Sequence, residues 1–180
     1  VWIVDDDEVG RVATAAALCA RGFRTVELSS GQEALAALAH GSPDLMVLDA
    51  LMPGMDGFET CQQLRAMPGL AALPVLMLTG LDDDASIEHA YEVGATDFFV
   101  KSRQWSLLVG RLRYLLRSAR TRQELERSKA RLARAQDLAR MGSFDWRLKS
   151  GLMLSPEALR VFGLGQGDPL SLRALLRMVP

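Results

Sequence analysis

The chain has 180 residues, of which 49% are hydrophobic, and this is enough apolar material for one large domain or for a domain and part of a second. No apolar run approaches the length of about 18 residues that a membrane span needs. No basic segment followed by an apolar leader opens the chain, so the composition favours a cytoplasmic protein without membrane contact.

The formal net charge of −1 hides an uneven distribution of charge along the chain. Residues 1–102 hold 5 lysines and arginines against 16 aspartates and glutamates, whereas residues 103–140 hold 11 against 3. We therefore expect an acidic unit followed by a basic one. The two cysteines, Cys19 and Cys61, show no metal-ligand spacing and are predicted to be buried, reduced thiols.

Short apolar runs alternate with segments of helical periodicity up to about residue 100. The runs predict strands at residues 1–4, 24–28, 45–48, 75–78 and 97–100, and the segments between them predict helices at 8–20, 32–39, 58–67 and 82–93. Crossover connections of this length require a parallel sheet with helices on both faces. The predicted fold is therefore an α/β, doubly wound, flavodoxin-like (βα)5 fold with strand order 2-1-3-4-5.

Polar side chains follow the predicted strands at the points where these strands end. Asp5 and Asp6 follow the first strand, Asp49 follows the third, Thr79 the fourth and Lys101 the fifth. In open parallel sheets, ligands bind outside the carboxyl ends of the strands. The sequence therefore predicts that this edge of the sheet carries the chemistry.

Five features stand in order along residues 1–117: the Asp5-Asp6 pair, Asp49, the loop Met52-Pro53-x-Met55-Asp56-Gly57, Thr79-Gly80, and Lys101 three residues after Phe98. Each feature alone has an ordinary alternative, since acids are common at strand ends, a threonine can cap a turn and a lysine is usually a surface residue. Taken together at these spacings, the pattern resembles the receiver domain of two-component response regulators.

The resemblance implies phosphoryl transfer to Asp49. A receiver catalyses its own phosphorylation from phosphohistidine on its partner, which is a sensor histidine kinase or a phosphotransfer protein. The cofactor implied is Mg²⁺, with Asp6 and Asp49 as direct ligands, Asp5 as a ligand through water, and the main-chain oxygen of Leu51 as the third protein contact. A phosphatase-like hydrolase is disfavoured, because Leu51 stands where such an enzyme needs an acid/base aspartate.

The resemblance also assigns the residues around the phosphoryl group. It implies that Lys101 pairs with this group, that Thr79 donates its hydroxyl to it, and that Thr79 and Phe98 form the switch. Ser102 follows Lys101, where receivers usually have a proline in a cis peptide. A non-proline cis bond costs about 2.5–4 kcal/mol, against about 0.5–1 kcal/mol for X-Pro, so the sequence leaves the geometry after Lys101 open.

Two apolar residues bear on the lifetime of the phosphorylated state. In receivers, the side chains two residues past the nucleophile and two past the threonine flank the approach of the hydrolytic water. These positions hold Leu51 and Leu81, and neither side chain can orient a water molecule. We therefore expect slow dephosphorylation.

Residues 103–140 predict one long helix that continues the fifth receiver helix. Leu125, Leu132 and Ala139 repeat every seven residues, and the phase slips near residues 118–122. This pattern predicts a parallel coiled-coil homodimer, and the alternative is a helix folded back on the receiver. The arginines lack interleaved aromatic residues or a recognition motif, so we interpret them as a solvated flank and expect no direct nucleic-acid contact.

Residues 141–180 predict a strand, a turn, a second strand and a helix capped by Ser155. The segment from Ala135 to Trp146 resembles the entry of a PAS sensory domain, truncated here at its N-terminal part. For a receiver joined to a PAS domain we expect an output such as cyclic-di-GMP turnover, with no separate enzymatic output in these residues. The alternatives are an unphosphorylated pseudo-receiver that acts as a dimerisation module and the receiver of a hybrid histidine kinase.

Overall fold

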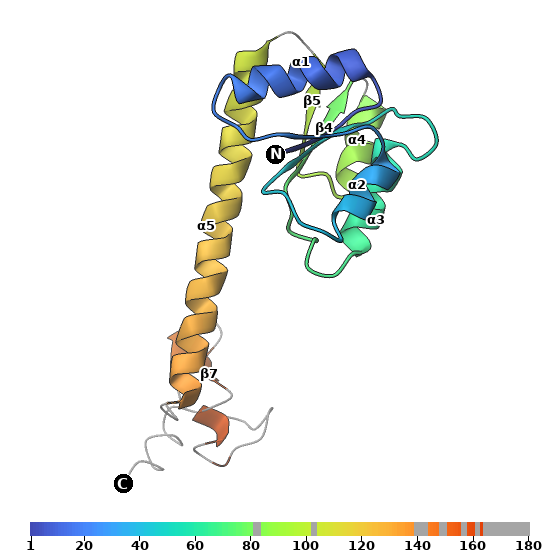
Figure 1. The fold of residues 1–180 in the computed structure, drawn as a ribbon. Helices are drawn as coiled ribbons and strands as arrows, with labels where there is room; N and C mark the ends of the chain where they lie inside the picture. The colour runs from blue at the N-terminus through green and yellow to red at the C-terminus, as the bar shows by residue number, and fades with distance from the viewer. Residues whose placement is uncertain are drawn as a thin grey trace. The chain divides into compact units, whose positions relative to one another are not determined.

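The computed structural model describes residues 1–80, 84–101, 104–138, 144–147, 151–155, 158–160 and 163 (Figure 1). The chain divides into two compact units, Val1–Arg122 and Gln123–Pro180, which are considered separately. Leu81, Ser102 and most of residues 141–180, which were predicted to begin a PAS domain, lie outside the described residues.

The first unit is built on a five-stranded parallel sheet with the order β2-β1-β3-β4-β5. Its strands are β1 (Trp2–Val4), β2 (Val26–Leu28), β3 (Met46–Asp49), β4 (Val75–Thr79) and β5 (Asp97–Val100). Both β3 and β4 are buried along their whole length, as expected for central strands covered on both faces. The predicted flavodoxin-like fold and strand order are confirmed.

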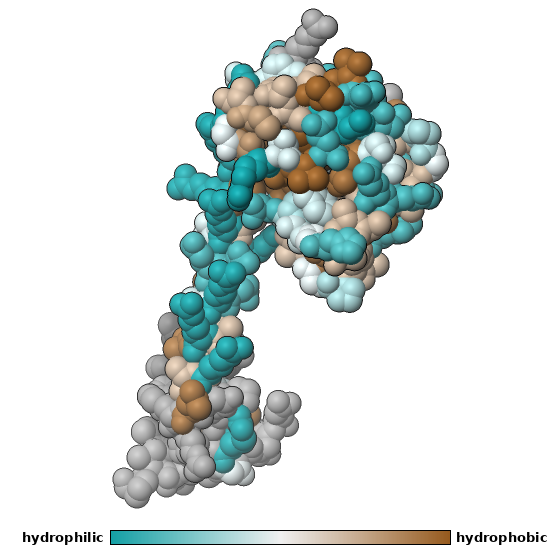
Figure 2. All heavy atoms as spheres, in the orientation of Figure 1, coloured by the Kyte–Doolittle hydropathy of each residue, from teal (hydrophilic) through white to brown (hydrophobic). Residues whose placement is uncertain are grey.

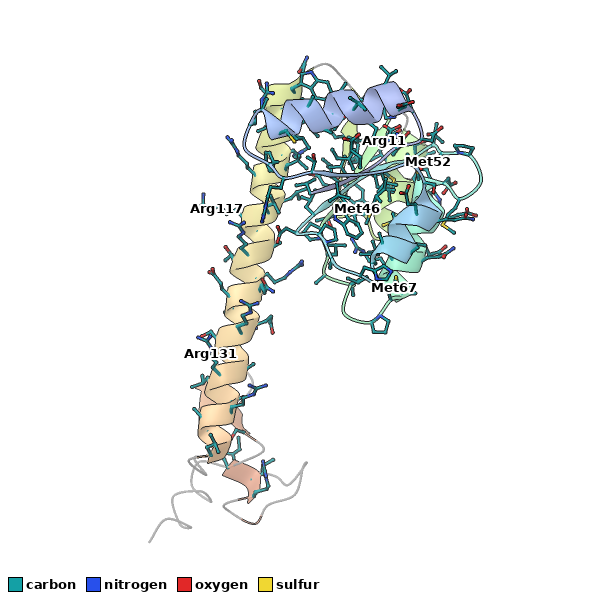
Figure 3. The ribbon with its side chains drawn as sticks, in the orientation of Figure 1. Arg11, Met46, Met52, Met67, Arg117 and Arg131 are labelled. Carbon is teal, nitrogen blue, oxygen red and sulfur yellow. The ribbon has the colours of Figure 1, made fainter. Side chains whose placement is uncertain are left out.

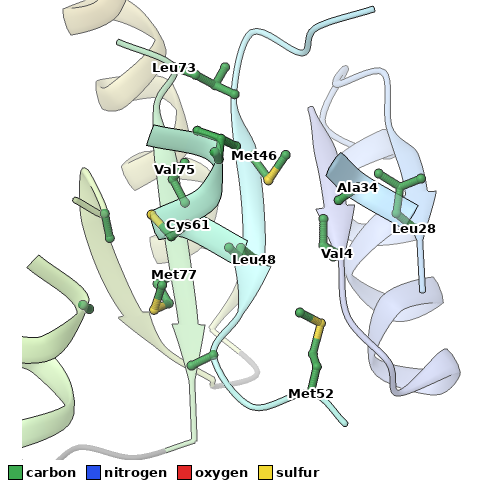
Figure 4. Packing of buried hydrophobic residues seen from close by; sticks show 14 residues of the cluster. Val4, Leu28, Ala34, Met46, Leu48, Met52, Cys61, Leu73, Val75 and Met77 are labelled. Carbon is green, nitrogen blue, oxygen red and sulfur yellow. The ribbon is translucent and has the colours of Figure 1, made fainter. Parts of the chain in front are cut away.

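Helices cover both faces of this sheet (Figure 1). They are α1 (Glu8–Cys19), α2 (Gly31–Ala37), α3 (Gly57–Ala66), α4 (Asp84–Glu92) and α5 (Trp105–Leu138). One core cluster joins β1, β3 and β4 to α2, α3 and α4, and Figure 4 shows Met46, Leu48 and Cys61 within it. The second cluster joins the other face of the sheet to Leu18 of α1 and Leu112 of α5.

The helices begin where capping side chains satisfy their first backbone amides. Asp7 accepts hydrogen bonds from the amides of Val9 and Gly10 at the start of α1. Ser30 caps α2 and Asp56 caps α3, each through the amide three residues later. Two of the acids near the strand ends, Asp7 and Asp56, therefore act as helix caps.

Some predicted boundaries differ from the observed ones. β2 begins at Val26, which pairs with Trp2 of β1, so pairing starts two residues later than predicted. α2 ends at Ala37, after which the amides of residues 39 and 40 bond to carbonyls three residues back, in a tighter turn.

The prediction of two buried thiols is wrong for Cys19. Cys61 is completely buried in α3, and this burial raises the pKa of its thiol. Cys19 is exposed at the last residue of α1, where its sulfur lies 3.1 Å from the Thr25 hydroxyl oxygen. The helical periodicity placed both residues on helices but did not establish which side of α1 faces the sheet.

The second unit contains the predicted hairpin. Strands β6 (Phe144–Arg147) and β7 (Gly151–Leu154) pair antiparallel, with Phe144 opposite Leu154. Ser155 Oγ accepts a hydrogen bond from the amide of Ala158 at 3.1 Å, as its predicted capping role requires. Along α5, the side chains of residues 120–135 are exposed. None of the described helices combines the length and apolar character needed to cross a bilayer.

Candidate functional site

The strand register brings three carboxylates together at the carboxyl edge of the sheet. Val4 of β1 lies opposite Leu48 of β3, so Asp5 and Asp49 leave neighbouring strands at the same level. Both carboxylates are buried, at 2% and 5% exposure, whereas Asp6 is exposed. Carboxylate oxygens of Asp5, Asp6 and Asp49 all lie within 4.8 Å of one another. The predicted acidic residues thus form one cluster.

Lys101, which directly follows β5, completes the cluster. The amide of Lys101 donates to the carbonyl of Thr79 at 2.7 Å, which continues the pairing of β4 and β5 past the end of β5. The Lys101 ammonium donates to Asp49 Oδ2 at 2.8 Å and to Asp5 Oδ2 at 3.0 Å. The side chain therefore points into the acidic cluster, although serine and not proline follows it.

The remaining predicted residues lie around this cluster at different depths. Thr79 is buried at the end of β4, one position beyond the residue that pairs with Asp49. The backbone of Leu51 lies beside the Asp49 carboxyl and acts to lower its pKa, and Leu51 is 54% exposed. Phe98 is half-buried on β5 and meets the ring of Tyr91 edge-on, with centroids 5.9 Å apart.

Burial and charge shift the two central pKa values. Burial raises the pKa of the Asp49 carboxyl, while the hydrogen bond and charge of Lys101 oppose the shift. For Lys101, burial alone would lower the pKa, but hydrogen bonds to Asp49 and Asp5 outweigh it and raise the pKa. Lys101 consequently carries its positive charge throughout the neutral pH range.

The donor set fits Mg²⁺. Three carboxylates face a single ammonium, so the cluster keeps an excess of negative charge in a partly buried place. Hard divalent cations prefer carboxylate and carbonyl oxygens, and a magnesium ion characteristically takes one or two carboxylates while keeping several waters. The exposed Asp6 leaves one side of the cluster open to such waters.

At Gly57, the loop after β3 packs closely against the backbone of Asp49. The amide of Gly57 donates to the Ala50 carbonyl at 3.0 Å, which folds the loop after β3 against the strand end. A Cβ at Gly57 would collide with the main-chain oxygen of Asp49 and lie 2.9 Å from Ala50 Cα. The motif glycine is thus required by close approach of two backbone segments.

One residue beside the cluster has no counterpart in the sequence analysis. Arg11 Nη1 donates to the main-chain oxygen of Asp5 at 2.6 Å. The only sequence signal was a basic residue one turn into a helix that begins with acids, and such a pattern also fits an ordinary surface arginine.

The response regulator receiver domain family matches residues 1–113 of the chain. Because this match covers more than half of the sequence, the chain belongs to the family of two-component response regulator receivers. The fold described above is therefore that of a receiver, and the acidic cluster and Lys101 lie within the matched residues.

Relatives show how far the similarity extends. The chain is 34% identical to the transcriptional regulatory protein AfsQ1 of Streptomyces coelicolor, over 98% of this chain and 77% of that protein. It is 33% identical to the phosphate regulon transcriptional regulatory protein PhoB of Rhizobium meliloti, over 92% and 77%. It is 35% identical to the response regulator PleD of Caulobacter vibrioides, over 72% of this chain and 29% of PleD.

Solved structures show the same fold. The receiver domain of a signal transduction histidine kinase from Syntrophus aciditrophicus superposes with a TM-score of 0.61 at 33% identity, covering 65% of this chain and 89% of the other. The chemotaxis protein CheY4 of Vibrio cholerae gives a TM-score of 0.61 at 29% identity, over 63% and 95%.

Replacing Gly57 with alanine is expected to displace the Asp49 backbone, because the added methyl has no space. Urea unfolding should show a loss of stability of about 1–3 kcal/mol, the range for overpacking a closed site. Gly41→Ala is the matched control, since a Cβ there meets nothing within 4 Å. Equal stability of the two variants would show that the loop after β3 yields without cost.

Proposed function

We propose that this receiver accepts a phosphoryl group on Asp49 from the phosphohistidine of a sensor histidine kinase or phosphotransfer protein. The observation that carries the proposal is the convergence of three carboxylates with the Lys101 ammonium at one edge of the sheet. Asp5, Asp6, Asp49 and the main-chain oxygen of Leu51 hold Mg²⁺ in this proposal. The family supports the partner, because receivers are phosphorylated by such proteins.

The chain's own residues supply a nucleophile and positioned charge. A carboxylate oxygen of Asp49 attacks phosphorus, an O–P bond forms, and the P–N bond of phosphohistidine breaks with its electron pair going to the imidazole nitrogen. Bound Mg²⁺ supplies neutralisation of the phosphoryl charge. Lys101 transfers its ammonium contact from the free carboxylate to the phosphoryl oxygens, and the Thr79 hydroxyl donates to them.

The signal leaves the site through the switch residues Thr79 and Phe98. Movement of Thr79 toward the phosphoryl group opens space near the half-buried Phe98 ring, which meets Tyr91 of α4. Asp97, next to Phe98, pairs with Arg111 of α5 at 3.1 Å. Both α4 and α5 are therefore coupled to β5 at the level of the switch.

In this proposal, α5 beyond the receiver forms a parallel coiled coil with a second copy of the chain. Leu125 and Leu132 are 53% and 62% exposed although they repeat at heptad spacing. The face of α5 visible in Figure 2 is largely hydrophilic. A seam of two large apolar residues per copy becomes buried only when a second helix covers it.

The output beyond the coil has two candidates. The β6–β7 hairpin supports the start of a PAS domain, followed by an output such as cyclic-di-GMP turnover. A transcriptional output is the second candidate, because AfsQ1 and PhoB, both named transcriptional regulatory proteins, match 98% and 92% of this chain. The candidates differ in whether the chain binds DNA, which a mobility-shift assay measures.

Asp49→Asn is expected to abolish phosphorylation while leaving the fold intact, because the amide keeps the shape of the side chain but is no nucleophile. Intact-mass measurement after incubation with acetyl phosphate and Mg²⁺ should show one phosphoryl adduct on the parent chain and none on the variant. Asp44→Asn, at an exposed acid just before β3, is the control and should retain the adduct. An adduct on the Asp49 variant would place the acceptor elsewhere, and an absent adduct on the parent would favour a pseudo-receiver.

Leu125→Lys combined with Leu132→Lys is expected to give monomers, because the seam would then bury charges between two helices. Sedimentation velocity should show a dimer for the parent and a monomer for this double variant. Ala130→Lys with Ala133→Lys adds the same charge at exposed positions outside the heptad seam and should remain dimeric. A monomeric parent protein would contradict the coiled coil.

Leu51→Asn combined with Leu81→Glu is expected to shorten the lifetime of phosphorylated Asp49 by roughly ten-fold or more, because polar groups can orient the hydrolytic water. Decay of the adduct after removal of acetyl phosphate measures this lifetime, which should extend well beyond seconds in the parent. Leu107→Asn, at a similarly exposed leucine of α5, should leave it unchanged. Fast decay in the parent would show that these two leucines do not limit hydrolysis.

A further inference from the structure

Arg11 reaches from α1 to the end of β1. Its side chain is only 15% exposed, and Nη1 donates to the main-chain oxygen of Asp5 at 2.6 Å. Figure 3 shows Arg11 on the side of α1 that faces the sheet. A charged hydrogen bond of this length to a single carbonyl is strong and directional. The contact therefore restrains the backbone of a residue whose carboxylate belongs to the acidic cluster.

The carbonyl that Arg11 binds belongs to the peptide joining Asp5 to Asp6. Fixing this oxygen fixes the plane of that peptide, because the peptide unit is rigid. Together with the turn closed by the Asp7 amide and the Asp5 carboxylate, this plane sets the direction in which the Asp6 side chain leaves the backbone. Arg11 thus acts on Asp6, the exposed member of the cluster, without touching its carboxylate.

The residues on both sides of Asp6 are held through their side chains. The Asp5 carboxylate is already held by the Asp7 amide at 2.9 Å and by Lys101. The Asp7 carboxylate is held by two amides at the start of α1. The Asp6 side chain is exposed and not packed against neighbours, so its position depends largely on its backbone.

The guanidinium of Arg11 is itself oriented from the other side. Its Nε lies 3.9 Å from a carboxylate oxygen of Glu27, on the edge strand β2. The Asp5 amide also donates to the Leu28 carbonyl at 3.1 Å, which anchors the end of β1 to β2. The edge strand and α1 together therefore support the carbonyl that precedes Asp6.

We propose that Arg11 is a positioning residue for the magnesium site, acting through the Asp5 carbonyl to aim the Asp6 carboxylate. This inference rests on the proposed function, since it requires that the cluster binds Mg²⁺. Groups that orient metal ligands typically affect metal affinity 10–100-fold when they are removed, although they never contact the metal.

The test measures Mg²⁺ binding by isothermal titration calorimetry, without any phosphodonor. Arg11→Gln is expected to raise the Kd for Mg²⁺ roughly ten-fold. Arg11→Lys, which keeps a cationic donor for the Asp5 carbonyl, should recover most of the affinity. The matched control is Arg21→Gln, in an arginine just after the same helix whose Nη1 donates to the Ala17 carbonyl at 2.9 Å, far along the chain from the cluster. It should bind as the parent does.

A second readout separates positioning from loss of fold. With acetyl phosphate as donor, Arg11→Gln should need more Mg²⁺ for half-maximal phosphorylation but reach the parent's rate at saturating Mg²⁺. A general structural defect would instead lower the rate at every Mg²⁺ concentration. If Arg11→Gln does not fold, Arg11→Met replaces it. The proposal then expects a folded Arg11→Met to bind Mg²⁺ more weakly than the parent, and Arg11→Lys to bind Mg²⁺ nearly as tightly as the parent.

An unchanged Kd in a folded Arg11→Gln or Arg11→Met variant overturns the proposal, as does equal weakening by Arg21→Gln. Failure of the proposed function gives a different result, because the parent chain itself would then bind no Mg²⁺ or, where only phosphoryl transfer fails, would show no adduct with acetyl phosphate. The two failures are therefore distinguishable by measurements on the parent protein.

Discussion

The contact of the Lys101 ammonium with Asp5 and Asp49 is the interaction on which the rest of the site depends. Two like charges about 5 Å apart repel by roughly 3 kcal/mol at an effective dielectric constant of about 20. The parallel register of β1 and β3 imposes this repulsion by placing the two carboxylates side by side. The Lys101 ammonium, directly after β5, offsets this repulsion, and the bond of the Lys101 amide to the Thr79 carbonyl holds its backbone beside β4. The sheet topology therefore creates the repulsion and supplies the charge that offsets it.

Much of this fold was predictable because its signals are local. Continuous apolar runs indicate strands buried on both faces, and β3 and β4 are buried throughout. A capping residue marks where a helix begins, as Ser155 does here. Strand order followed from the lengths of the crossovers and the family resemblance. The boundaries that differed, at β2 and α2, depend on where pairing with β1 starts and on a tightened turn, which periodicity does not report.

The candidate site was predictable in its residues but not in its support. Polar side chains after four strands indicated where the chemistry lies, and the structure brings Asp5, Asp6, Asp49 and Lys101 together. The close approach of Gly57 to the Asp49 backbone and the contact of Arg11 with Asp5 required coordinates. Both depend on distances between segments that only the folded chain brings together. A sequence pattern shows that a residue recurs in a motif, but it does not show what that residue touches.

The unequal burial of the two cysteines allows selective chemical labelling of this chain at Cys19. Cys61 lies completely inside the sheet–helix core, and its raised pKa keeps the thiolate scarce, so alkylating reagents react with it slowly. Cys19 stands exposed where α1 ends. Because α1 runs back from the carboxyl edge of the sheet, this thiol lies at the helix end remote from Asp49. A fluorescent or spin label can therefore be attached at a single native position, away from the acidic cluster, without substituting any residue.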